Sequence, residues 1–74
     1  MALIINRLDR ENSYVDGPIE FIGPTHWIID GKFVAITGET TFGGIPAVVG
    51  ANARADGYLS DDKTYLIATH INVY

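Results

Sequence analysis

Two β-rich segments meet at Asp30-Gly31, and this junction constrains the fold more than any other part of the chain. The flanking segments, residues 27–29 and 32–36, consist mainly of β-branched and aromatic residues, which favour strands. An Asp-Gly pair suits the type I′ turn between antiparallel strands, because both turn residues must adopt a positive φ. The sequence therefore predicts a tight β-hairpin here, with the other strands laid beside it.

The composition favours a single all-β domain. The chain has 74 residues, 47% of them hydrophobic, with isoleucine, valine and threonine prominent. A chain of this length lies near the lower size limit for one hydrophobic core, so association between subunits would add stability. The sequence contains no cysteine, which excludes disulfides, thiolate metal sites and a cysteine nucleophile.

The charge balance and the hydropathy pattern argue against two classes of partner. Nine acidic and five basic residues give a formal net charge of −4. The five cations are scattered along the chain, so we expect no positive groove, and binding of single-stranded nucleic acid is a less favoured alternative. No apolar run approaches the roughly 18 residues that a membrane-spanning segment requires. We predict no membrane span, and the sequence leaves the cellular compartment open.

Alternating hydrophobicity and turn residues predict further elements on both sides of the hairpin. The expected elements are a short strand at Leu3-Ile4-Ile5, strands at 18–22, 51–58 and 64–73, a loop at 37–44 that contains one or two bridge residues, one helical turn at 45–50 and a polar hairpin loop at 60–63. Residues 1–14 form an N-terminal strand or arm in this interpretation, and residues 15–74 form the barrel domain.

Two of these strands carry signs of a closed or strongly curved sheet. Small residues, Ala53 and Ala55 among them, alternate on one face of the 51–58 strand and would let it curve across a barrel interior. The apolar pattern of the last strand changes phase, which predicts a β-bulge near Thr69 or His70. We therefore predict a small five- to six-stranded, partly open barrel of OB-like type with one short helical turn.

The order and spacing of short elements over residues 15–73 resemble a bacterial family of small domains of unknown function with an OB-like barrel. The elements that carry the resemblance are Gly17, Ile29-Asp30-Gly31, residues 40–44, Val49-Gly50, residues 51–57, Asp61-Asp62-Lys63 and the Ala68 to Ile71 segment. The chain departs from the family pattern at Ala53 and Ala55, where valine is expected, and at Lys63, where glycine is expected. The resemblance implies a small barrel and no catalytic residues.

No group of residues in the sequence predicts catalysis, a cofactor or a metal. His26 and His70 are ligand types that suit zinc, and Asp30, Asp61 or Asp62 would be needed beside them, but no spacing indicates a site. A metal-assisted hydrolase built on the two histidines is therefore the weakest of the hypotheses. We expect a non-enzymatic protein.

Two hypotheses of binding remain. The first is an interaction module that associates with itself or with a protein partner through the apolar segment Leu3, Ile4 and Ile5. The second is a barrel that binds a small ligand or an oligosaccharide by stacking on an aromatic face, as OB-like barrels do. The candidate contact residues for a ligand or partner are Trp27, Tyr58, Tyr65 and Arg54.

Overall fold

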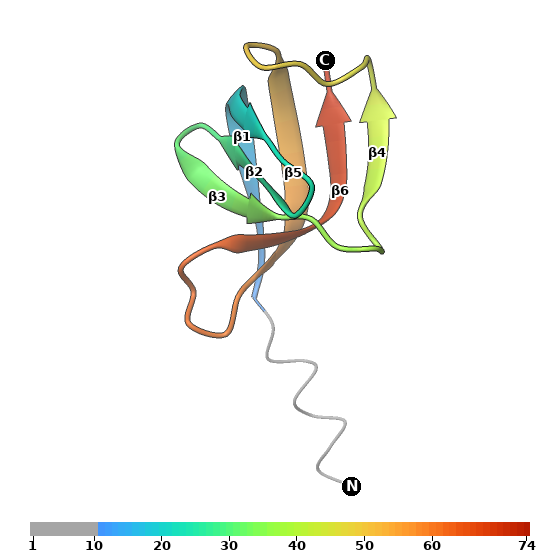
Figure 1. Cartoon of the computed structure of the whole chain (residues 1–74). Coiled ribbons are helices and arrows are strands. Elements are labelled where there is room, and N and C mark those ends of the chain that lie inside the picture. Colours follow the sequence, from blue (N-terminus) through green and yellow to red (C-terminus); the bar gives the residue numbers. More distant parts are fainter. Residues whose placement is uncertain (1–10) are drawn as a thin grey trace, which may run out of the picture.

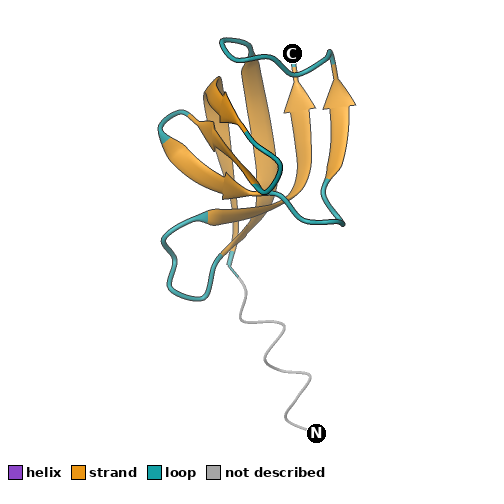
Figure 2. Ribbon diagram, in the orientation of Figure 1, coloured by secondary structure: helices purple, strands orange, loops and turns teal. Residues whose placement is uncertain are grey.

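The computed structural model describes residues 11–74, and these form six strands and no helix (Figures 1 and 2). The strands are β1 (Asn12–Ile22), β2 (His26–Ile29), β3 (Lys32–Ala35), β4 (Thr41–Gly44), β5 (Asn52–Leu59) and β6 (Leu66–Val73). The predicted all-β fold is confirmed. Residues 45–50 form an irregular turn where a helical turn was expected.

The strands form one sheet that closes into a small barrel. Their order is β3-β2-β1-β5-β6-β4, and an additional pairing joins β3 to β6. This parallel pairing closes five strands through only two residue pairs, Val34 with Leu66 and Ala35 with Ile67. The sixth strand, β4, lies outside the closed ring and pairs in parallel with the C-terminal half of β6. The predicted small barrel is thus confirmed, with a short seam.

The first strand serves both sides of the barrel. Residues 12–18 of β1 pair with β5, and residues 19–22 pair with β2. The register shifts between Ile19 and Phe21, which leaves Glu20 as the extra residue of a bulge that bends the strand. β1 begins earlier than the predicted 18–22 segment because its first half is held by β5, and the expected boundary between residues 14 and 15 lies within it.

The hairpin at Asp30-Gly31 forms as the sequence predicts. Both residues have positive φ, 54° and 75°, and Ile29 pairs with Lys32 across the turn. The turn is also fixed to β1, because the Asp30 amide donates to the Pro18 carbonyl and the Gly31 amide to Glu20 Oε1.

One face of each barrel strand supplies the core. Ile29, Val34 and Ile71 are fully buried, and so are Ala53 and Ala55 on the predicted small-residue face of β5. The other core residues are Val15, Ile19, Trp27, Leu66, Ala68 and Val73. The small side chains of β5 leave room for the larger ones of β1 and β6 inside a narrow barrel.

The predicted β-bulge in the last strand is present at Thr69. Asp56 pairs with His70 and Gly57 with Ala68, so Thr69 is the extra residue, and its hydroxyl donates to the Asp56 carbonyl at 3.1 Å. Gly57 is required at this point, since a Cβ there would lie 2.0 Å from the Ile67 carbonyl oxygen. The bulge reverses the alternation, so that both halves of β6 face the core.

Segment 37–44, predicted as a loop, contains β4. The buried hydroxyl of Thr40 donates to the Ala68 carbonyl at 2.8 Å and accepts from the Thr37 amide at 2.9 Å, which holds the entry to the strand against β6. Gly44 has a φ of 86°, and a Cβ there would lie 1.8 Å from the Val73 carbonyl oxygen. Close approach to β6, rather than intrinsic strand propensity, therefore defines β4.

Residues 1–10 are outside the described part of the chain, and the predicted interface residues Leu3, Ile4 and Ile5 belong to them. Within residues 11–74, no helix is long and apolar enough to cross a bilayer.

Candidate interaction surface

The β4 edge of the sheet has no neighbouring strand within residues 11–74 (Figure 1). β4 carries no charge and no proline, which are two of the devices that protect exposed sheet edges. The chain that continues from it is apolar and exposed. We call β4 together with residues 45–49 the β4 patch, and its most exposed large side chains are Phe42, Ile45, Val48 and Val49, between 54% and 63% exposed.

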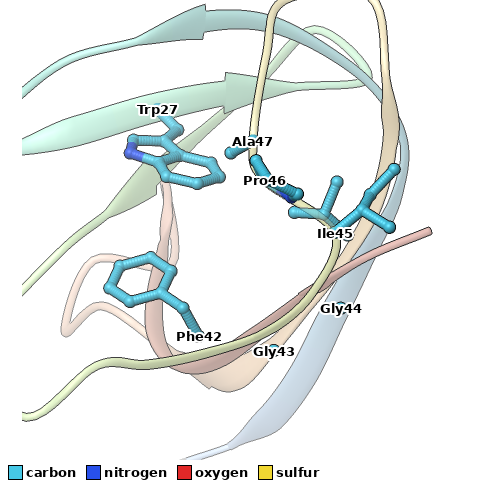
Figure 3. A pocket seen from close by; sticks show the side chains of 8 residues that line it. Trp27, Phe42, Gly43, Gly44, Ile45, Pro46 and Ala47 are labelled. Carbon is cyan, nitrogen blue, oxygen red and sulfur yellow. The ribbon is translucent and has the colours of Figure 1, made fainter.

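An apolar pocket of about 450 Å³ opens beside this edge. Trp27 and Phe42 lie across the opening from the loop that carries Pro46 and Ala47 (Figure 3). The remaining lining residues are Gly43, Gly44, Ile45 and Val73. None of these residues carries a charged side chain, and the Trp27 indole is the one hydrogen-bonding side chain among them. An apolar group can therefore enter this pocket without removing water from a charged side chain.

Trp27 joins the core to the β4 patch. Its side chain is only 6% exposed, and its ring stacks on Phe42 with centroids 5.5 Å apart and planes at 27°. Phe42 itself is 54% exposed, so one side of its ring is covered by Trp27 while much of the rest faces solvent. The predicted contact residue Trp27 therefore lies behind the exposed surface.

A second group of aromatic side chains follows the outer side of β2 and β3. Phe21, His26 and Phe33 are stacked in sequence, with centroids 5.1 Å and 4.3 Å apart, and Tyr65 contacts Phe33 edge to face. Phe21 also packs over Gly23, where a Cβ would lie 2.7 Å from the ring. His26 stacks on both phenylalanine rings, and Phe21 and Phe33 remain 45% and 43% exposed.

The four predicted contact residues do not gather at one site. Tyr65 belongs to the aromatic row, and it shares a shallow depression with Tyr58 at the β5–β6 hairpin. Trp27 lines the β4 pocket, which contains neither tyrosine. Arg54 lies on the outer face of β5, above the Tyr14 ring at 4.3 Å.

The cations of residues 11–74 are all engaged with carboxylates. Arg54 contacts Asp56 at 3.1 Å, and this hydrogen-bonded pairing raises the pKa of the guanidinium. Lys32 pairs with Asp30 and Lys63 with Glu11. The described part of the chain thus has no cation left over to line a positive groove.

The two histidines have separate surroundings. His26 stacks between Phe21 and Phe33, whereas His70 Nδ1 hydrogen-bonds the Thr41 hydroxyl at 2.7 Å. In the part of the chain that the structure describes, no three His, Asp or Glu side chains are placed to hold a metal ion.

The β4 patch was missed at the level of sequence. Residues 45–49 read as a turn because Pro46 and Gly50 punctuate them, and the exposure of their apolar side chains depends on how the turn packs. The signal that would have revealed the patch is an apolar run in a segment with no strand or helix period. Comparison with known protein families, with characterised proteins and with solved structures found no match to this chain, so the resemblance stated above stays a prediction.

Proposed function

We propose that this protein is a non-enzymatic interaction module that binds a second protein chain, either a partner or another copy of itself, through the β4 patch. The observation that carries the proposal is the coincidence of an unpaired strand edge with an apolar pocket and exposed Phe42 and Ile45. An added strand gains main-chain hydrogen bonds from the edge, and its side chains gain an apolar pocket.

The strand arrangement supports the finer interpretation as an OB-like barrel. One half of β1 pairs with β2 and the other half pairs with β5. β3 and β6 close the barrel as a parallel pair. The segment between β3 and β5 contains β4 and the 45–49 turn, and β4 lies outside the closed ring. The proposed binding surface is therefore an elaboration of the barrel.

The electrostatic arrangement supports a protein partner over nucleic acid. The three cations of residues 11–74 pair with acidic side chains, and the β4 pocket has no charged lining. A phosphate backbone finds no counter-charge on such a surface.

A small apolar molecule is the second candidate ligand, because the β4 pocket is concave and falls within the usual size range of ligand sites. An oligosaccharide has less support. Its hydroxyl groups need hydrogen-bonding side chains, which the β4 pocket lacks apart from the Trp27 indole.

Amide NMR spectra of the full chain, recorded with a panel of uncharged peptides rich in Val, Ile and Phe, test the proposal. We expect shifts at residues 42–47 and at the Trp27 indole. Phe42→Ser should weaken peptide binding at least about tenfold, since it removes a central aromatic contact. Tyr14→Ser is the matched control, because Tyr14 is equally exposed but lies on β1, away from the patch. If no peptide perturbs the patch and diluting the chain changes nothing there, the proposal is wrong.

A further inference from the structure

We infer that the occupant of the β4 patch is the segment Leu3-Ile4-Ile5 of a second copy of this chain, added as a strand along the free edge of β4. This inference rests on the proposed function and names the partner that the function leaves open. Three observations carry it: the match of apolar character and length, the charge distribution, and the reach of the intervening chain.

The segment and the edge match in length and chemistry. β4 has four residues, and the three consecutive β-favouring residues Leu3, Ile4 and Ile5 make an uncharged strand of similar length. The pocket beside the edge has an apolar lining and room for an aliphatic side chain. Burying one against the other removes apolar surface on both sides from water and desolvates no charge.

Charge complementarity fixes the direction of the added strand. Residues 1–10 contain two arginines and one aspartate, so a net charge of −4 for the whole chain leaves −5 on residues 11–74. Near β4 the acidic group is Glu39, which is exposed and takes part in none of the ion pairs among the described residues. An antiparallel strand brings Arg7 towards Glu39, whereas a parallel one carries it towards the uncharged Ile45 end.

This direction defines a register. With Ile5 opposite Thr41, Ile4 lies opposite Phe42 and Leu3 opposite Gly43. Residues directly opposite in an antiparallel pair share a face of the sheet. Ile4 is then the side chain on the pocket side, next to Phe42, and Arg7 follows the added strand at the end where the 37–40 turn carries Glu39.

The reach of the chain favours a second copy over the molecule's own segment. The distance to be spanned runs from the start of β1 to the free edge of β4, and β5, β6 and β4 lie between them. Along the strands, Asn12 is level with Ile67 of β6, through Tyr58 of β5, whereas Thr41 is level with His70 of β6. Four strand spacings and three residues along the strand amount to about 21 Å. The seven residue steps from Ile5 to Asn12 span at most about 25 Å, so the molecule's own segment reaches the free edge only when it is almost fully extended. A neighbouring copy has no such limit, and reciprocal exchange closes a two-fold dimer.

Sedimentation of the full chain over a range of concentrations tests the inference. We expect a monomer–dimer equilibrium that Ile4→Asp and Phe42→Asp each weaken at least tenfold, and that Leu8→Asp, the same apolar-to-acid change outside the docking segment, leaves in place. Arg7→Glu and Glu39→Lys should each weaken the dimer up to about fivefold, and the double variant should recover most of the loss. Circular dichroism of each variant confirms that the barrel is folded. A full chain that stays monomeric at every concentration overturns the inference.

A peptide experiment separates failure of this inference from failure of the proposed function. A synthetic peptide of residues 2–11 is added to the Ile4→Asp chain, with a scrambled peptide as control. If the native peptide shifts the amide signals of residues 42–47 and the scrambled peptide does not, both the inference and the proposed function are supported. Shifts with unrelated apolar peptides but none with this one overturn the inference and leave the proposed function standing, and silence with every peptide overturns both.

Discussion

At the scale of residues, the absence of a side chain at Gly44 allows β4 to lie against β6. Gly44 combines a φ of 86° with a backbone so near β6 that a Cβ would lie 1.8 Å from the Val73 carbonyl oxygen. Gly44→Ala therefore forces β4 away from β6, and we expect a loss of at least about 2 kcal/mol in the free energy of unfolding, measured with urea. Gly38→Ala is the control, because a Cβ at Gly38 meets nothing within 4 Å and should change stability by less than about 0.5 kcal/mol. Equal effects of the two variants would contradict this account of β4.

At the scale of elements, the Asp62 carboxylate accepts several of the hydrogen bonds that hold the loop between β5 and β6. Asp62 accepts hydrogen bonds from the hydroxyls of Ser60 and Thr64, both at 2.7 Å, and from the Thr64 amide. The bond from Ser60, followed by those from Thr64, lowers the pKa of Asp62 in the folded protein. A lowered folded pKa stabilises the protein above the ordinary pKa of aspartate, and this stabilisation is lost as the pH falls through the folded value.

We therefore expect Asp62→Ala to reduce stability at pH 6 and to lose less on acidification to pH 3 than the parent chain does. Urea unfolding at several pH values measures both quantities. Asp61→Ala is the neighbouring control, since Asp61 makes none of these hydrogen bonds, and it should keep the acid dependence of the parent. An unchanged acid dependence in Asp62→Ala would assign the loop's stability to other contacts.

Some of these elements were predictable and others were not, for physical reasons. The Asp30-Gly31 hairpin and the Thr69 bulge follow from local turn chemistry and from a change of phase in the apolar pattern. β4 was missed because Gly43 and Gly44 favour turns, and only pairing with a strand far along the chain makes them a strand. The grouping of candidate side chains also failed to follow from sequence, because which rings meet depends on how the barrel closes.

Across the whole molecule, small buried side chains line the β5 side of the narrow barrel. Ala53 and Ala55 are completely buried, and valine is expected at these positions by the resemblance described above. Ala55→Val should overpack the core and cost about 1–3 kcal/mol in thermal or urea unfolding. Ala35→Val is the comparison, because Ala35 is only partly buried and lies on the outer side of β3. A stabilised Ala55→Val variant would mean that the core holds unfilled space at this point.

The short seam between β3 and β6 has a consequence for how the molecule folds and opens. Val34 and Leu66 pair across a sequence separation of about thirty residues. Only two residue pairs offset the loss of chain entropy when that loop closes. The β1–β2–β3 and β5–β6 hairpins involve nearer neighbours, so we expect them to form first. The β1–β5 pairing closes longer loops, but it gains seven residue pairs where the seam gains two, so we expect the seam to close last. In the native state the same seam is the weakest line of the barrel, and amide exchange at Val34, Ala35 and Ile67 should report its opening before any global unfolding.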